Sequence, residues 1–336
     1  MPRIHLLLSL VSAVAVDCSL AHAGDASSAF IIGADISWVQ QQEAEGKRWS
    51  DHGAQKDILA ILKDRGFNWI RLRIFVDPKA DGGYSKQGFC DLEPTLQMAK
   101  RVKSAGMRLL LDFHYSDTWA DPGNQRKPAA WSDLRGKELE KAVYGHTRDV
   151  VVALKRQQTP PEMVQIGNEI NHGMLWPDGR VWETMDWEAF GGLLKAGIAG
   201  VREVDPAIRI MIHLACGGDN ARSRGFLDRV LEQRVDFDII GQSYYPRWHG
   251  TLDDLKSNLT DLARRYEQPI IVVEYSVPDI REINDIVRGL PDGKGLGTFI
   301  WEPTRRRGGT LFDQNGNTRP EFDIYADMAK DFGLLK

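Results

Sequence analysis

The chain has 336 residues, of which 42% are hydrophobic and 27% charged, a composition that allows a sizeable core and excludes wholesale disorder. Its formal net charge of −4 at pH 7 provides no basic field to gather phosphates, which argues against nucleic acid as a partner. The length fits a single α/β barrel of about 250 residues plus insertions, so we expect one large domain that acts as a monomer.

The N-terminal segment has the pattern of a secretory signal peptide. Arg3 is followed by an apolar run from Leu6 to Val16, and Ala21-His22-Ala23 places small residues at the two positions that a signal peptidase reads. We therefore expect residues 1–23 to be removed and residues 24–336 to be secreted or periplasmic. The apolar run is too short to span a bilayer, and no later stretch reaches the roughly 20 apolar residues that a membrane helix requires.

Apolar or β-branched runs of strand length alternate with segments of helical spacing along the rest of the chain. One such segment carries Ile58, Leu59, Ile61 and Leu62 and ends at Gly66, a residue type that commonly follows a helix. The expected strands are Phe30–Ser37, Trp69–Phe75, Arg108–His114, Met163–Glu169, Arg209–Ala215, Phe237–Tyr245, Pro269–Ser276 and Leu296–Trp301. Strict alternation without a linker predicts a single closed (β/α)8 barrel over residues 24–336.

Polar residues gather where the expected strands end. They are Asp35, Ser37, Arg71, Arg73, Asp112, His114, Asn168, Glu169, His213, Ser243, Tyr244, Tyr245, Glu274, Trp301 and Glu302. In a closed barrel all of these come to one rim, where barrel enzymes carry their active sites. Arg71, Asp112 and His213 lie inside otherwise apolar strands, and buried groups of this kind require partners.

Two of the expected strands deliver a carboxylate to their tips. Glu169 ends the run that starts at Met163, and Glu274 ends the run that starts at Pro269. On the fourth and seventh strands, their side chains would face each other across the mouth of the barrel. Glycoside hydrolysis needs one carboxylic acid that protonates the leaving oxygen and one carboxylate that attacks, or activates water, from the other side. Asn168 fits as a hydrogen-bond donor to the sugar 2-hydroxyl.

Several segments together carry a family pattern. The run from Asp112 to Pro122 is long and specific, whereas Asn168-Glu169 alone is shared by many families. The other segments are Gly33–Ser37, Ile70–Arg73, Gln165–Glu169, Leu175–Pro177, Ser243–Pro246 and Trp301–Pro303. In these segments the chain resembles glycoside hydrolase family 53, within the large clan of retaining (β/α)8 glycosidases. The resemblance implies a retaining endo-β-1,4-galactanase that acts on β-1,4-galactan or type I arabinogalactan without a cofactor.

The resemblance also implies roles for the residues at the rim. Glu169 would be the acid/base and Glu274 the nucleophile. Arg71 would pair with Glu274 and help to keep its pKa low by favouring the charged form.

Further contacts follow from the same resemblance. Tyr245 is expected to hydrogen-bond the nucleophile, because the clan pattern places a polar residue two positions earlier and Ser243 fits; Tyr244 remains an alternative. Trp301 would form the floor of the −1 subsite. Asp112 and His114 are two residues apart on one strand, so their side chains are expected to point to the same face, inward. The implied substrate contacts are these two residues together with Asn168, Trp119 and Trp176.

The segment after Trp301-Glu302-Pro303 departs from the family pattern. In place of a longer, aromatic-rich loop the chain reads Thr304-Arg305-Arg306-Arg307-Gly308-Gly309-Thr310. These arginines are either solvated or border the cleft, where they would favour substrates that carry carboxylates. The change leaves open the preferred polysaccharide and the endo or exo mode. Asp313–Asn317 is too short for a calcium loop and is interpreted as a turn.

Two other classes of function remain as alternatives. Asp112, His114 and His213 would be ligands in a metal-dependent barrel such as a sugar isomerase or an amidohydrolase, but nothing in the sequence has compact metal-ligand spacing. A carbohydrate-binding barrel with decayed catalytic groups is the other, but both carboxylates are present. Cys90 and Cys216 fall after the second and fifth strands, a placement that argues against a disulfide.

Overall fold

Short polar side chains set where the helices begin. Asp57, Asp91 and Asp219 each accept a hydrogen bond from a backbone N–H at the start of α2 (Ile58–Asp64), α3 (Leu92–Ser104) and α6 (Asn220–Glu232). Helix α8 (Leu252–Arg265) begins with a capping box, in which Thr251 and Asp254 exchange hydrogen bonds. Such caps satisfy N–H groups that have no partner within the helix, and each contributes about 1 kcal/mol.

The computed structural model of the chain describes residues 29–305 and 310–335, so the expected signal peptide lies outside the described residues. The barrel strands are β1 (Ile31–Asp35), β4 (Trp69–Ile74), β5 (Arg108–Phe113), β6 (Met163–Ile166), β9 (Arg209–Leu214), β10 (Ile239–Tyr244), β11 (Ile270–Tyr275) and β12 (Gly295–Trp301). The remaining elements are α1 (Val39–Ala44), β2 (Ser50–Asp51), β3 (Ala54–Gln55), η1 (Ala129–Trp131), α4 (Gly136–Arg156), β7 (Gly173–Met174), β8 (Gly179–Arg180), α5 (Trp187–Val204), α7 (Pro246–His249), α9 (Ile280–Arg288), η2 (Pro291–Gly293) and α10 (Glu321–Asp331). All eight expected strands are confirmed, with ends shifted by a few residues.

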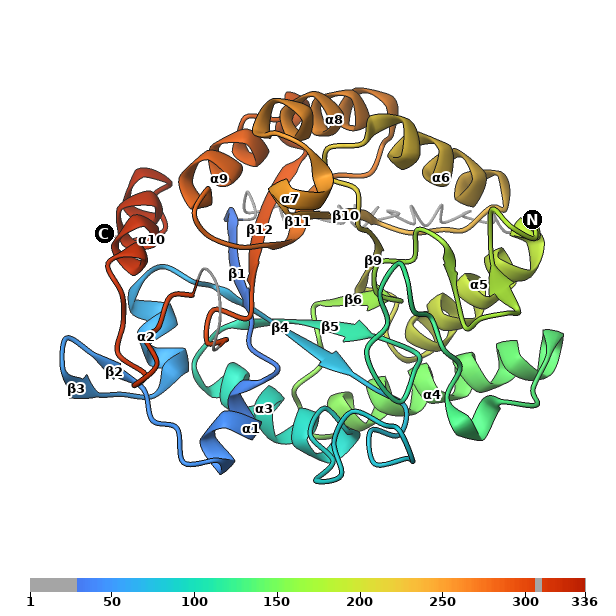
Figure 1. Cartoon of the computed structure of the whole chain (residues 1–336), viewed down its shortest axis with the longest axis horizontal. Coiled ribbons are helices and arrows are strands. Elements are labelled where there is room, and N and C mark those ends of the chain that lie inside the picture. The colour runs from blue at the N-terminus through green and yellow to red at the C-terminus, as the bar shows by residue number, and fades with distance from the viewer. Residues whose placement is uncertain (1–28, 306–309, 336) are drawn as a thin grey trace, which may run out of the picture.

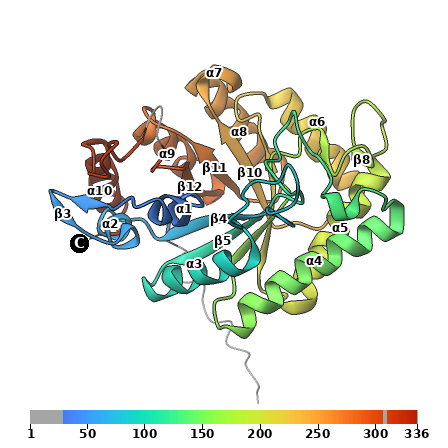
Figure 2. The ribbon, with the colours of Figure 1, turned by 60° about the horizontal axis from the view of Figure 1, so that its bottom comes forward.

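The strands form a closed parallel barrel in the order β1-β4-β5-β6-β9-β10-β11-β12. Closure is visible at β1, where Asp35 pairs with Arg71 of β4 on one side and with Trp301 of β12 on the other. The longer helices surround the barrel, with α10 between α9 and α2 (Figure 1). The Tyr325 ring of α10 packs 4.5 Å from the ring of Phe67, which follows α2. Helix α7, which directly follows β10, projects beyond the ring of longer helices (Figure 2).

The interior of the barrel, at the end where the strands begin, is an apolar layer to which every barrel strand contributes. Its buried side chains are Ile31, Trp69, Leu110, Met163, Met211, Ile239, Ile271, Val273 and Phe299. Two strand glycines make room for this layer: a Cβ at Gly33 would lie 2.2 Å from Phe299, and one at Gly241 would lie 2.7 Å from Met211 Sδ. The layer is packed like any protein core, so a ligand can enter only from the C-terminal end of the strands.

Outward-facing strand side chains pack against the helices in a second apolar core. Cys90 and Cys216 are both buried free thiols, as their placement in the sequence predicts. Within residues 29–305 and 310–335, no helix is both long and apolar enough to cross a membrane.

Candidate active site

Strand alternation brings a polar layer inward above the apolar one. On β4, Trp69 belongs to the apolar layer, and Arg71, two residues further along, faces the same interior. On other barrel strands, too, an apolar residue of the inner layer is followed further along the strand by a buried polar residue. The buried polar residues of this second layer are Asp35, Arg71, Arg73, Asp112, Gln165, His213 and Ser243.

Arg71 is the centre of this polar layer. Its guanidinium donates to five side-chain oxygens at 2.7 to 3.2 Å, which belong to Gln165, Asp35, Glu274, Asp112 and Asn168. These bonds use all five N–H donors that an arginine has. Although burial lowers the pKa of Arg71, the nearby carboxylates of Asp112 and Glu274 raise it further, so the side chain stays charged. One buried cation therefore fixes side chains from four other strands and from the loop after β6.

A register shift in β11 turns Glu274 into the barrel. Ile271 and Val273 already belong to the apolar layer, so strict alternation would point Glu274 outward. The pairing of β10 with β11 skips one residue immediately before Glu274, which lies opposite Ser243. This is the effect of a β-bulge, which re-aims the side chain that follows it.

Two donors hold the Glu274 carboxylate. Arg71 Nη1 donates to Oε1 at 2.7 Å, and the Tyr245 hydroxyl donates to Oε2 at 3.0 Å. The Tyr244 hydroxyl instead donates to a backbone carbonyl at 3.0 Å, so of the two alternatives Tyr245 is the one that contacts Glu274. Burial raises the pKa of Glu274, and Arg71 opposes that shift without cancelling it. Arg71 therefore pairs with Glu274 and lowers its pKa as expected, but burial, together with the nearby Asp35 carboxylate, outweighs the guanidinium, so the net shift is upward.

Glu169 enters the mouth from the loop after β6. The backbone turns at Gly167 with φ 80°, and Glu169 itself has φ 47°, a conformation uncommon for residues other than glycine. Ser243 Oγ donates to Glu169 Oε1 at 2.8 Å, and His213 Nε2 lies 2.7 Å from Ser243 Oγ. The backbone N–H of Glu169 donates to His213 Nδ1 at 3.3 Å. Because Nδ1 accepts, Nε2 carries the imidazole proton and donates to Ser243, which leaves the serine hydrogen for Glu169.

The surroundings of Glu169 favour its protonated form. Burial and the neighbouring Glu274 carboxylate raise the pKa of Glu169 to about 8, while Ser243 and Arg71 lower it only in part. All five donors of Arg71 are used by other groups, so none reaches Glu169. A carboxyl group that holds its proton at neutral pH and a carboxylate held by a cation thus share one mouth, the combination that acid/base chemistry requires.

Asn168, Asp112 and His114 line the same mouth with fixed orientations. Asn168 Nδ2 donates to the Ala120 carbonyl at 2.9 Å, and its Oδ1 accepts from Arg71, so the amide cannot turn over without losing both bonds. His114 Nδ1 accepts from the Ala120 N–H at 3.1 Å, and its Nε2 lies 3.1 Å from Asp112 Oδ2. Asp112 and His114 therefore both point inward, as their shared strand parity predicts.

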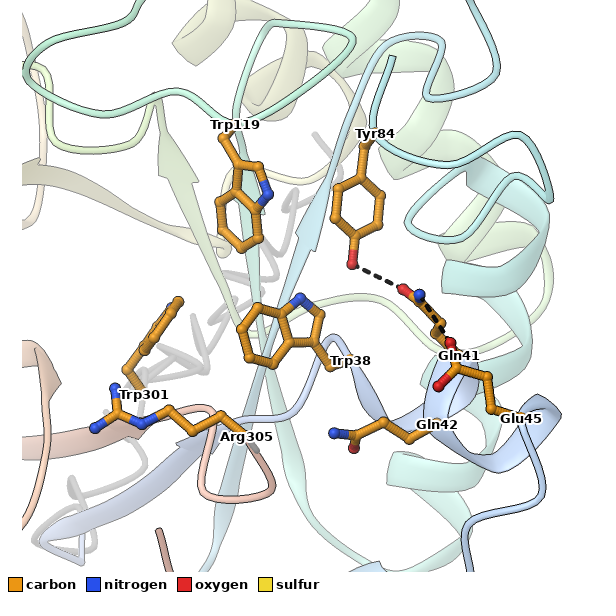
Figure 3. Close-up of a pocket in the computed structure, with 8 residues that line it drawn as sticks. All are labelled: Trp38, Gln41, Gln42, Glu45, Tyr84, Trp119, Trp301 and Arg305. Carbon is orange, nitrogen blue, oxygen red and sulfur yellow. Dashed lines mark hydrogen bonds between the residues drawn. The ribbon is translucent and has the colours of Figure 1, made fainter. Parts of the chain in front are cut away.

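An aromatic pocket of about 600 Å³ opens at the rim near β1 and β12. Its lining residues are Trp38, Gln41, Gln42, Glu45, Tyr84, Trp119, Trp301 and Arg305 (Figure 3). The Trp38 ring centroid lies 5.4 Å from that of Trp301 and 6.1 Å from that of Trp119, both edge to face. Large apolar ring faces of this kind suit the packing of sugar rings.

Trp38 and Tyr84 also line this pocket, although neither is among the site residues expected from the sequence. Trp38 directly follows the polar end of the first strand, a signal that could have found it, and its backbone N–H donates to Glu302 Oε1 at 3.1 Å. Glu302 also pairs with the buried Arg73. The guanidinium of Arg73 lies 4.3 Å from the centroid of Trp119, so this ion pair supports the pocket. Tyr84 comes from a loop without periodicity, which gives no such signal.

Comparison with known proteins agrees with this geometry. The model of glycosyl hydrolase family 53 matches residues 31–285, which run from β1 into α9. The chain belongs to glycosyl hydrolase family 53. A Niallia circulans protein encoded in the 5′ region of bgaB is 44% identical over 350 residues, covering 92% of this chain and 94% of its own. Arabinogalactan endo-β-1,4-galactanase A of Aspergillus niger is 35% identical over 306 residues, covering 81% and 84%. The family 53 catalytic domain of Ignisphaera aggregans matches with a TM-score of 0.81 at 35% identity, covering 90% of this chain and 97% of its own.

Family 53 membership leaves the metal-dependent alternative without support. Asp112 and His114 contact each other, but His213 hydrogen-bonds Ser243 instead, so the three do not converge as a ligand set. In the part of the chain that the structure describes, no group of three histidine, cysteine or acidic side chains could hold a metal ion.

Trp176, which the family resemblance implies as a sugar contact, lies on the loop after β6 and is not part of the pocket in Figure 3. Its indole Nε1 donates to the His172 carbonyl at 2.9 Å, and the Arg180 guanidinium lies 4.4 Å from its ring centroid. Trp176 follows Glu169 in the segment after β6, the strand opposite β12 in the barrel. Its contact with sugar stays a prediction.

The segment after β12 is described in part. Arg305 lines the aromatic pocket, with its Cζ atom 5.5 Å from the Trp301 centroid, so this arginine borders the cleft. Arg306 and Arg307 lie outside the described residues. Asp313 Oδ1 accepts the backbone N–H groups two and four residues further along at 2.8 Å, as in the turn that the sequence predicts.

Proposed function

We propose that the chain is a retaining endo-β-1,4-galactanase that cleaves β-1,4-galactan or type I arabinogalactan. The observation that carries the proposal is the pair of unlike carboxyl groups in the mouth: Glu169 with a pKa of about 8, and Glu274 held by Arg71 and Tyr245. The substrate class is supported by the Aspergillus niger relative, which bears the name of that activity. The N-terminal signal pattern supports the further proposal that the enzyme is exported to its polysaccharide.

In the first step Glu169 acts as general acid and Glu274 as nucleophile. Glu169 gives its proton to the glycosidic oxygen while the Glu274 carboxylate attacks the anomeric carbon. The glycosidic bond breaks, a galactosyl ester forms on Glu274, and the leaving portion departs with the proton. Arg71 and Tyr245 each bind one oxygen of the nucleophile, which favours its ionised form and aims it.

In the second step Glu169 acts as general base. Esterification of Glu274 removes the negative charge that helps to raise the pKa of Glu169, so the pKa of Glu169 falls. Having given up its proton in the first step, Glu169 is now a carboxylate that can activate water. Glu169 takes a proton from water, which attacks the anomeric carbon and releases Glu274 with overall retention. Asn168 donates to the 2-hydroxyl, and the His213–Ser243 chain keeps Glu169 in place through both steps.

Hydrolysis of unbranched β-1,4-galactan tests the proposal. Early products separated by thin-layer chromatography are expected to be a range of galacto-oligosaccharides, and proton NMR is expected to show the β-anomer first. An initial α-anomer would contradict the double displacement. Release of a single small sugar from the start would replace endo with exo action, and cleavage of a glucan or mannan in place of galactan would overturn the substrate.

A further inference from the structure

The aromatic pocket carries a cation that the catalytic steps do not use. Arg305 is partly buried, with its guanidinium on the Trp301 side of the pocket (Figure 3). The opposite side carries a carboxylate, Glu45, which accepts from Gln41 Nε2 at 3.2 Å. The hydroxyl of Tyr84 donates to Gln41 Oε1 at 3.1 Å and continues this hydrogen-bonded row. The pocket thus has a guanidinium on its Trp301 side and a hydrogen-bonded row of Tyr84, Gln41 and Glu45 on the other.

The position of the pocket defines which part of the substrate it meets. The general acid protonates the oxygen of the portion that leaves, and Glu169 follows β6. Strand β6 lies opposite β12 in the barrel, four steps along the order β12-β11-β10-β9-β6. Trp38 and Trp301, at the ends of β1 and β12, are therefore on the side away from the acid. The pocket takes the non-reducing portion, which stays bound to Glu274.

We propose that Arg305 makes this pocket select a galactan chain whose retained portion carries a carboxylate, as in a uronate unit. The inference rests on the proposed galactanase function and deepens it. A guanidinium binds a carboxylate through two parallel N–H bonds, a match that neutral hydroxyl groups do not provide. The Trp301 face beside the guanidinium adds a cation–π contact that restricts its plane, and partial burial reduces screening by salt.

The buried carboxylate of Glu302 is already paired, because it forms an ion pair with the buried Arg73. With the Arg305 guanidinium on the Trp301 side of the pocket, an acidic unit is held with its carboxylate toward Arg305 and the remainder of its ring along Trp38 and Trp301.

The test uses pairs of galacto-oligosaccharides that differ in one group. In one member the terminal non-reducing galactose is intact, and in the other its C6 is oxidised to a carboxylate, over a series of increasing chain length. The ratio of kcat/KM for the acidic and neutral members is measured at low and high ionic strength. Wild type is expected to prefer the acidic member by about tenfold at the length that places this unit in the pocket, and less so at high salt.

Two charge-removing variants locate the effect. Arg305→Gln is expected to lose the preference. Arg264→Gln removes the same charge from an exposed position in the last turn of α8 and is expected to keep it. The neutral oligosaccharides report on the galactanase function itself, and their turnover by Arg305→Gln reports on folding.

A wild-type ratio of one or less at every length would overturn the inference, and this outcome needs no variant. A preference that survives in Arg305→Gln, or that falls equally in both variants, would also overturn it, because general attraction would then explain the effect. Failure to cleave either member would count against the proposed function instead.

Discussion

Glu169 and Glu274 share one mouth, yet their partners differ in kind. Burial raises the pKa of both carboxyl groups, so burial alone does not distinguish them. Glu274 accepts hydrogen bonds from the charged Arg71 and from Tyr245, whereas Glu169 accepts from Ser243, the end of a neutral chain. The different roles of these two like side chains are therefore set by their neighbours, chiefly by which groups accept the hydrogen bonds of the single buried Arg71.

Removal of each carboxylate in turn is expected to have the largest effect and tests whether Glu274 and Glu169 have different roles. Glu274→Ala is expected to abolish turnover of all substrates and to be rescued by azide as the α-galactosyl azide, because the anion takes the vacated side of the sugar. Glu169→Ala is expected to lose about 10²- to 10⁴-fold on galactan but much less on a dinitrophenyl galactobioside, whose leaving group needs little protonation. Azide should then give the β-galactosyl azide. Equal losses on both substrates in both variants would contradict the assignment.

Arg71→Met tests whether the buried cation stabilises the fold and is needed for the activity of the two carboxyl groups. The change leaves Asp35, Asp112 and Glu274 without their shared partner, so we expect a loss of about 3–5 kcal/mol in the free energy of unfolding in urea, together with nearly complete loss of activity. Arg101→Met is the matched control, since Arg101 also pairs with two carboxylates but near the surface. It should cost no more than about 1 kcal/mol. Similar costs for both would mean that the Arg71 network contributes little to stability.

Much of this arrangement can be predicted from the sequence, because apolar runs that end in polar residues mark both the strands and the rim. Glu169 and Arg71 are found this way. The direction of the Glu274 side chain cannot be predicted from the sequence. Strict alternation after Ile271 would point it outward, and only the register shift in β11 turns it inward. The position of Arg71 inside an apolar strand indicates that it needs hydrogen-bond partners, but not that it has five of them. The walls of the aromatic pocket, such as Tyr84, come from loops, where no period links sequence to direction.

Tyr245→Phe is expected to give a smaller effect on the nucleophile side. Loss of a hydrogen bond to a charged carboxylate costs about 1.5–3 kcal/mol, so kcat should fall by about ten- to a hundredfold. Tyr244→Phe removes the neighbouring hydroxyl, which binds a backbone carbonyl, and is expected to leave kcat within a few-fold of wild type. Steady-state kinetics on galactan compare the two directly. A larger loss in Tyr244→Phe would reverse the assignment of the tyrosines.

Ser243→Ala is expected to give the smallest effect and the most specific one. The Ser243 hydroxyl lowers the pKa of Glu169, so its removal raises that pKa further, and the loss of activity at alkaline pH should move to higher pH. The rate at the optimum should fall only a few-fold, because the proton on Glu169 remains available. A shift of the alkaline limb to lower pH would show that the hydroxyl does not stabilise the carboxylate.

The pH dependence of kcat/KM for wild type and Glu169→Gln tests the central claim most directly. In wild type the rate should fall at acidic pH as Glu274 takes up a proton, below its raised pKa, and at alkaline pH as Glu169 loses its proton, near a pKa of about 8. With a dinitrophenyl galactobioside, Glu169→Gln should keep the acidic limb and lose the alkaline one. An alkaline limb that persists unchanged in Glu169→Gln would contradict the account, because the proton lost near that pH would then belong to another group.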